Sequence, residues 1–152
     1  MDIELDAVAR EWLQEEIRAL LERLPTLESQ APYRALASAI EVGHVPETLL
    51  GALEKLLELG LQTGRIRYLY GPHAEATLLR LYHRTPAGTA VARATDEVNQ
   101  ALANLQGHTI QEIAFIPRGP GQYQLTIETD RCQLILETNR EGIWIKALEV
   151  QA

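Results

Sequence analysis

The sequence lacks several features that would place the protein outside a simple globular class. Cys132 is the only cysteine, so no disulfide can form within the chain. No apolar run approaches the ~20 residues of a membrane-spanning helix, and the acidic N-terminus lacks the basic and then apolar pattern of a signal peptide. With 46% apolar and 23% charged residues and no low-complexity tract, we expect a packed cytoplasmic protein with no membrane partner.

The motifs of common catalytic and metal sites are also missing. None of the four histidines has a metal-ligand spacing to Cys, Asp or Glu. There is no Gly-x-Ser-x-Gly, no phosphate-binding loop and no dinucleotide fingerprint. We therefore predict a protein that is not an enzyme, with no catalytic residue, no metal and no cofactor.

The net charge of −7 is spread unevenly along the chain. Residues 1–64 carry 12 acids and 5 bases, residues 65–107 carry 3 acids and 5 bases, and residues 108–152 carry 6 acids and 4 bases. The overall charge argues against a general polyanion binder. Only the middle segment has a net positive charge, which predicts either a contact with nucleic acid or a solvated face without a partner.

Three helices are predicted in the first 60 residues. Apolar residues recur at helical spacing over residues 4–24, and Pro25 ends that helix. Residues 26–31 read as a linker before a shorter helix at about 32–42. A leucine-striped third helix is expected from Pro46 to Leu59, with Gly60 as its left-handed C-terminal residue.

The next segment contains two candidate strands. Arginines alternate with Ile and Tyr over Arg65–Tyr70, which predicts a strand, and Gly71-Pro72 predicts a turn. Residues 74–84 are ambiguous, because Leu and Arg alternate as in a strand while other residues line up as in a helix. We favour a strand over 77–83. The helical alternative rests on Ala74, Leu78 and Leu81.

A long helix and a sheet are predicted for the rest of the chain. Thr85-Pro86 suits a helix start, and apolar residues at seven-residue spacing continue to about Leu105. Such a seam can pair with a second copy or lie on a sheet. Four segments of period-two alternation then predict a four-stranded antiparallel meander. Its inner face is expected to carry Tyr123, Leu125, Ile127, Cys132, Leu134, Leu136, Ile143 and Ile145.

The opposite face of the predicted sheet also carries apolar residues. We assign Ile135, Trp144 and Leu148 to it as candidate partner-binding residues. Apolar side chains on the supposedly wet face of an antiparallel sheet indicate that something covers it. The cover is either the N-terminal domain, a second copy of the chain or a different protein.

Residues 32–90 resemble a winged helix-turn-helix of the MarR or PadR type. Leu59-Gly60-Leu61 is similar to the ending of recognition helices, and Tyr82 to Gly88 is similar to the passage from the wing into the next helix. The resemblance implies a winged-helix-like domain at 1–90, followed by a helix-plus-sheet domain at 86–152. The expected fold class is α+β, with a helical N-terminal domain, a long helix and a four-stranded antiparallel β-meander.

The resemblance implies a transcriptional regulator that binds double-stranded DNA through its wing and dimerises through the 86–105 helix. Three of the six exposed positions expected on the third helix are acidic, namely Glu47, Glu54 and Glu58, which opposes base readout by that helix. The alternative is therefore an interaction or assembly factor that uses the scaffold without binding DNA, through the 86–105 helix or the outer sheet face. The candidate nucleic-acid contacts are Arg34, Lys55, Arg65, Arg67, Arg80 and Arg84.

Overall fold

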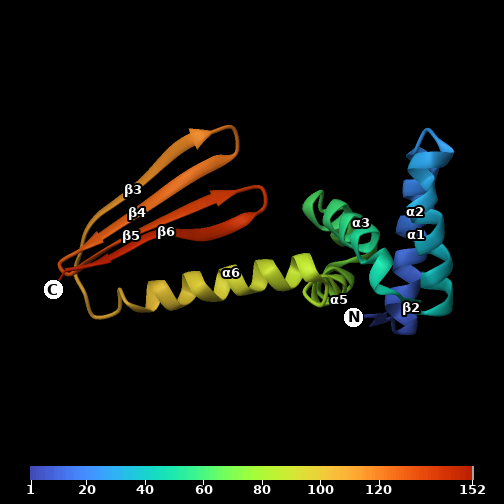
Figure 1. The fold of residues 1–152 in the computed structure, drawn as a ribbon, viewed down its shortest axis with the longest axis horizontal. Helices are drawn as coiled ribbons and strands as arrows, with labels where there is room; N and C mark the ends of the chain where they lie inside the picture. Colours follow the sequence, from blue (N-terminus) through green and yellow to red (C-terminus); the bar gives the residue numbers. More distant parts are fainter. Residues whose placement is uncertain (152) are drawn as a thin grey trace. The chain divides into compact units, whose positions relative to one another are not determined.

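A computed structural model describes residues 1–151 and divides the chain into two compact units, Met1–Thr89 and Ala90–Ala152. The first unit is helical, and the second contains a four-stranded antiparallel sheet, β3–β6, with a long helix, α6, along one face (Figure 1). The predicted α+β class, with a helical part followed by a long helix and a meander, is confirmed.

The first unit is built from five helices and a small strand pair, with one turn of 3-10 helix. The two-residue strands β1 and β2 pair antiparallel, Ile3 with Val45 and Glu4 with His44. In chain order the elements are β1 (Ile3–Glu4), α1 (Ala7–Arg23), α2 (Leu27–Val42), β2 (His44–Val45), η1 (Glu47–Leu49), α3 (Leu50–Gln62), α4 (Arg65–Tyr70) and α5 (Pro72–Tyr82).

Neither of the first two helices begins where it was predicted to begin, at residue 4 and at about residue 32. Helix α1 begins after Asp6, whose carboxylate accepts the backbone N–H of Ala9 at 2.7 Å. Helix α2 begins at Leu27, so the predicted linker at 26–31 is wrong. The side chains of Thr26 and Ser29 form a reciprocal capping box, which satisfies two helix-terminal N–H groups and favours an early start.

The third helix extends beyond its predicted end. Helix α3 continues to Gln62, and Gly60 lies buried inside it instead of ending it. A Cβ at position 60 would come within 2.6 Å of Ile66 Cδ1, so the glycine lets α4 pack closely. The left-handed residue is Gly64, with φ of 72°.

Both predicted wing strands are wrong, because the two segments form helices α4 and α5. In α5 the buried residues are Ala74, Leu78 and Leu81, the helical pattern that was the alternative. In α4 only Ile66 is buried. The described residues of the first unit therefore contain no pair of wing strands between α3 and α6.

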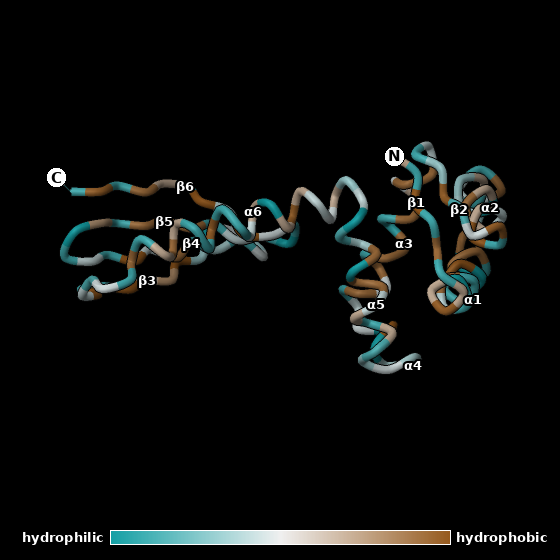
Figure 2. Tube along the Cα trace, turned by 90° about the horizontal axis from the view of Figure 1, so that it is seen from below, coloured by the Kyte–Doolittle hydropathy of each residue, from teal (hydrophilic) through white to brown (hydrophobic). Residues whose placement is uncertain are grey.

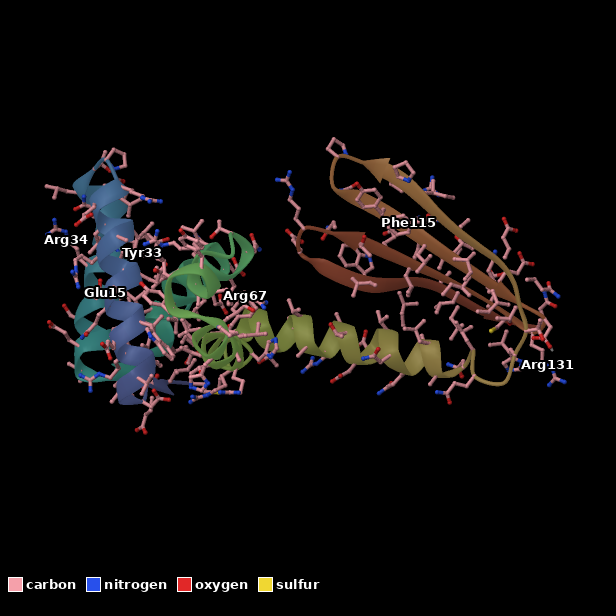
Figure 3. The ribbon with its side chains drawn as sticks, turned by 180° about the vertical axis from the view of Figure 1, so that it is seen from behind. Glu15, Tyr33, Arg34, Arg67, Phe115 and Arg131 are labelled. Carbon is pink, nitrogen blue, oxygen red and sulfur yellow. The ribbon has the colours of Figure 1, made fainter. Side chains whose placement is uncertain are left out.

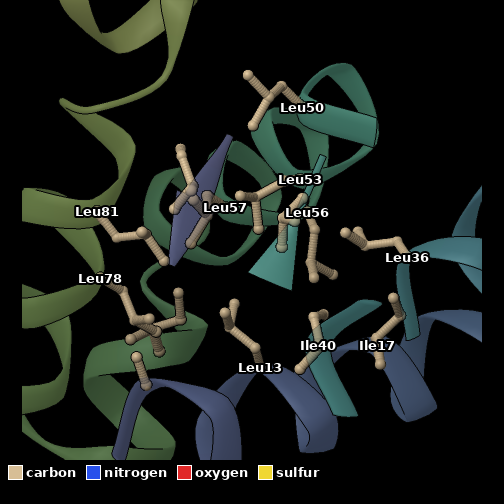
Figure 4. Packing of buried hydrophobic residues seen from close by; sticks show 14 of the residues in the cluster. Leu13, Ile17, Leu36, Ile40, Leu50, Leu53, Leu56, Leu57, Leu78 and Leu81 are labelled. Carbon is tan, nitrogen blue, oxygen red and sulfur yellow. The ribbon is translucent and has the colours of Figure 1, made fainter. Parts of the chain in front are cut away.

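A single apolar cluster holds the first unit together. Leucine and isoleucine side chains from α1, α2, α3 and α5 meet in its centre (Figure 4). Full burial of each such side chain contributes roughly 1.5–3 kcal/mol. The labelled members are Leu13, Ile17, Leu36, Ile40, Leu50, Leu53, Leu56, Leu57, Leu78 and Leu81.

The second unit is the predicted meander. Its strands are β3 (Ile110–Gly119), β4 (Gln122–Thr129), β5 (Cys132–Asn139) and β6 (Gly142–Val150), in that order across the sheet. They alternate between hydrophobic and hydrophilic residues (Figure 2). Helix α6 (Pro86–Ala103) packs Val98 and Ala101 against Leu134 and Leu136, so its apolar seam lies on the sheet.

The strand register assigns the faces of the sheet. Leu125 pairs with Leu136, and Leu136 pairs with Ile145, which places all three on the face covered by α6, as predicted. Leu148 pairs with Leu134 and therefore shares that face as well. Its predicted place on the outer face is wrong, because the bulge between Ile135 and Leu136 shifts the register of β6.

Candidate functional site

A buried carboxylate links α1 to α4 in the first unit. Glu16 is charged, but its side chain is buried, with only 5% exposed. Its two oxygens accept hydrogen bonds from Arg65 Nε at 3.1 Å each, and Oε1 also accepts from the hydroxyl of Tyr70 at 2.8 Å. A buried charge is tolerated when it is paired and hydrogen-bonded in this way.

The tyrosine in this cluster is held in its neutral form. Burial, and after it the hydrogen bond to Glu16, raises the pKa of Tyr70 well above its ordinary value. Tyr70 thus remains a donor to Glu16 at neutral pH, and Arg65 supplies the positive charge. The cluster fixes α4 in position and shows no arrangement of a nucleophile beside a general base.

An apolar groove opens beside this cluster, between α1, α3 and α4. Its volume is about 520 Å³. Three of its apolar side chains are well exposed: Leu59 at 50%, Tyr68 at 88% and Leu69 at 46%. The complete lining is Glu16, Ala19, Leu20, Arg23, Leu56, Leu59, Thr63, Gly64, Arg65, Tyr68 and Leu69.

Two arginines give this groove a positive charge. Arg65 bonds to Glu16 only through Nε, and the two terminal nitrogens of its guanidinium form no hydrogen bond in the part of the chain that the structure describes. Arg23 is exposed and forms no ion pair within residues 1–151. With Glu16 neutralised by Arg65, the groove lining has a net charge of about +1 in a chain of net −7.

The six candidate nucleic-acid contacts do not form one basic surface. Arg65 lines the groove, whereas Arg80 and Arg84 line a separate pocket together with Glu4 and Asp6. Figure 3 shows Arg34 on α2 and Arg67 on α4. Most of these side chains already have partners: Arg34 with Gln30, Arg65 with Glu16, Arg67 with Glu75, Arg80 with Thr77 and Arg84 with the carbonyl of Glu4, while Lys55 is exposed.

The acids of α3 have structural partners. Glu54 Oε1 accepts the backbone N–H of Ala87 at 2.7 Å, in the first turn of α6. Glu58 Oε1 accepts the hydroxyl of Tyr82 at 2.9 Å. Both were expected on an exposed reading face, but they are half-buried. This face of α3 packs against the end of α5 and the start of α6.

On the sheet, Ile135 and Trp144 lie on the face opposite α6 and are half-buried. Trp144 Nε1 donates to Glu137 Oε2 at 3.3 Å, and Lys146 Nζ lies 3.0 Å from Glu137 Oε1. The hydrogen bond from Lys146 lowers the pKa of Glu137 below its ordinary value. Ile135 and Trp144 are half-buried, whereas three apolar side chains of the groove are well exposed, so this face is a weaker docking surface than the groove.

Little in the sequence indicates the groove. Its residues come from three helices, and one of these was predicted as a strand. The signal that could have found it is Glu16, an acid beside the apolar stripe of residues 4–24, together with the arginine-rich segment that could neutralise it.

Within residues 1–151 no group of three or more His, Cys, Asp or Glu side chains could hold a metal ion. The helices of this part of the chain are all too short or too polar to cross a membrane. In comparisons with known proteins, no family model, no curated protein and no solved structure matches the chain.

Proposed function

We propose that the helical unit is a non-catalytic protein-interaction module that binds a helix of a partner protein in the groove between α1, α3 and α4. The exposure of Leu59, Tyr68 and Leu69 around one concave apolar site carries this proposal. Water-exposed aromatic and leucine side chains that gather at a groove are typical of helix recognition. A cytoplasmic location remains the prediction from the lone cysteine.

The chemistry of the groove defines the helix that fits it. An apolar stripe at i, i+3 or i+4 and i+7 would cover Leu59, Tyr68 and Leu69. A carboxylate beside that stripe would meet Arg23 or the free end of Arg65. Such a charge-assisted hydrogen bond contributes about 1.5–3 kcal/mol when it is sheltered from water, so it would favour acidic amphipathic helices over basic ones.

DNA binding, the other prediction from the sequence, has weaker support. Of the six candidate contacts, five already bond to neighbouring groups in the first unit. The helix expected to read base edges uses Glu54 and Glu58 to hold α5 and α6. An acidic chain of net charge −7 repels phosphates that approach the rest of α3. The two segments predicted as wing strands, which were to contact the DNA backbone, are helices.

A peptide selection tests the proposal. A display library of helix-forming peptides is selected against the full chain, and the enriched peptides are measured against variants by calorimetry. We expect an apolar helical stripe with Asp or Glu beside it. Leu59→Asp should weaken binding by about tenfold or more, because it places a charge in the apolar contact, and Arg23→Glu should weaken it through repulsion of the carboxylate.

Leu27→Asp is the matched control. Leu27 is 75% exposed at the first turn of α2, outside the groove, where an acid is favourable for the helix. It should leave peptide affinity unchanged. A selection without enrichment, or enriched peptides that bind the Leu59→Asp chain as well as the wild type, would contradict the proposal.

A salt titration with mixed-sequence duplex DNA separates the two functions. The interaction module predicts no binding at low ionic strength. A regulator would bind with an affinity that falls steeply as salt is added, and Arg65→Glu with Arg67→Glu would abolish the binding. That second outcome would replace the proposed function with DNA recognition.

A further inference from the structure

Strand β3 is an edge strand that leaves apolar side chains uncovered. It is the first strand of the order β3-β4-β5-β6, so its outer backbone edge has no partner within the sheet. Ile113 is 59% exposed and Phe115 is 61% exposed. Phe115 (labelled in Figure 3) stacks on Tyr123 of β4, with ring centroids 5.2 Å apart. Proteins usually shorten, charge or cover such an edge.

The exposed apolar residues lie on one defined face. Ile113 pairs with Ile127 and Phe115 pairs with Leu125, so both share the face covered by α6 further along the sheet. The register is regular from Glu112 to Pro117, between bulges at either end. This regularly paired six-residue stretch can accept another strand, and Arg118 lies in the bulge directly after it.

One charge on this edge is poorly placed in a single copy. Glu112 is directly opposite Glu128 of β4. Like charges directly opposite each other destabilise a sheet. Among the described residues neither carboxylate forms an ion pair. Arg118, in the bulge at the other end of the same strand, donates hydrogen bonds only to the neutral side chain of Gln124, although it lines a small pocket together with Glu137.

We propose that β3 pairs antiparallel with β3 of a second copy of this chain, about a two-fold axis centred on Phe115. Paired residues must share a face, so only registers centred on a residue are allowed. The register centred on Phe115 places Glu112 opposite the partner's Arg118, and Arg118 opposite the partner's Glu112. Centring on Ile113, Ala114 or Ile116 brings no opposite charges together.

Self-pairing also uses the apolar row. Phe115 would lie beside the partner's Phe115, and Ile113 beside the partner's Pro117, which covers both exposed side chains on the α6 face. Pro117 has no N–H and contributes only its carbonyl, so the pairing is short. The charges favour a second copy as the partner of this edge, because β3 carries both Glu112 and Arg118 and so complements itself. This surface is separate from the helical groove.

The experiment measures the mass of the full chain in solution by sedimentation over a concentration series. The wild type should reach twice the 17.0 kDa chain mass. Glu112→Arg and Arg118→Glu should each weaken dimerisation by about tenfold or more, because each variant places like charges opposite each other across the two-fold. The first variant also removes the repulsion from Glu128, so loss of fold is not its expected effect.

The most decisive part of the experiment is a mixture of the two variants. The Glu112→Arg chain and the Arg118→Glu chain should form a heterodimer when mixed, although each dimerises poorly alone. The doubly substituted chain, with both changes, should regain the wild-type mass. A wild type that stays monomeric to its solubility limit, a dimer that neither variant weakens, or a mixture that forms no heterodimer would overturn the proposal.

Discussion

At the scale of single residues, Glu16 shows how one buried acid can position a surface helix. Arg65 and Tyr70 are both on α4 and both donate to it. Without this acceptor, α4 would keep only Ile66 as a buried anchor. The wall of the groove that carries Tyr68 and Leu69 is therefore held in place by this polar cluster.

The two partners of this ion pair should not be equivalent on substitution. Arg65→Met leaves a buried carboxylate with Tyr70 as its only donor, and we expect it to cost about 3 kcal/mol of unfolding free energy. Glu16→Gln keeps an acceptor for Tyr70 and leaves an Arg65 side chain that is 33% exposed to water, so a cost of about 1 kcal/mol is expected. Urea unfolding measures both, and the reverse order would contradict this account of the cluster.

Two glycines provide a second contrast between single residues. A Cβ at Gly88 would come within 1.8 Å of the carbonyl oxygen of Tyr82, whereas one at Gly51 meets nothing within 4 Å. Gly88→Ala should therefore destabilise the chain by about 1–3 kcal/mol. Gly51→Ala, in an exposed part of α3, should stabilise it by about 0.5–1 kcal/mol. Thermal unfolding with the same sign for both variants would be inconsistent with this packing.

At the scale of elements, the sequence predicted helices and strands well where a long repeat was present. The seven-residue seam from Val91 to Leu105 predicted α6, and the period-two segments after Ile110 predicted all four strands of the meander. Each of these patterns extends over enough residues for the period to be clear. Thr85 was also predicted to cap the start of α6, and its Oγ1 accepts the N–H of Gly88 at 3.2 Å.

The errors fall where the pattern was short. Arg65–Tyr70 alternates over six residues, too few to separate a period of 2 from 3.6. Burial of Ile66 in the core and the hydrogen bonds to Glu16 of α1 favour the helix. Over residues 77–83 the helical alternative placed Leu78 and Leu81 on one side. Burial of both side chains in the core favours the helix over the predicted strand. The groove could not be predicted, because it needs α4 as a helix.

The contact between α3 and α5 should make stability depend on pH in alkaline solution. Burial, followed by the hydrogen bond to Glu58, raises the pKa of Tyr82 from 10.0 to about 12. A group with a raised folded-state pKa stabilises the fold below its unfolded pKa, and this contribution is lost as the pH rises through the folded value. The stabilisation from Tyr82 should thus be complete below pH 10.0 and decline towards pH 12.

Tyr82→Phe isolates this effect. The difference in unfolding free energy between wild type and variant should shrink as the pH rises from 10.0 to about 12. Tyr70 also has a raised pKa, but it is present in both proteins and cancels in the difference. Urea unfolding at a series of pH values measures it. A difference that stays constant across the interval would show that the hydroxyl of Tyr82 is not held by Glu58.

At the scale of the whole molecule, the two compact units have separate apolar clusters and one tryptophan each. Trp12 packs against the cluster of the helical unit, and Trp144 lies on β6 of the second unit. Fluorescence of the single-tryptophan variants Trp12→Phe and Trp144→Phe therefore reports on one unit at a time. These two variants thus test whether each apolar cluster stabilises its own unit.

A core substitution in each unit should affect only the local reporter. Leu53 and Leu134 are both fully buried, one in each cluster. Leu134→Ala should destabilise the unfolding transition reported by Trp144 by about 2–5 kcal/mol and leave the transition reported by Trp12 unchanged. Leu53→Ala should destabilise the transition reported by Trp12 by a similar amount and leave that of Trp144 unchanged. Equal shifts at both reporters would mean that the units unfold as one cooperative body.

The most direct measurement of the proposed interaction is the place where a selected peptide lies on the chain. A photo-reactive benzoylphenylalanine replaces Tyr68 in one full-length variant and Leu27 in another, since both positions are exposed. The groove between α1, α3 and α4 predicts that a selected acidic amphipathic peptide cross-links at position 68 and not at position 27. Cross-linking at position 27 alone, or equally at both, would contradict it.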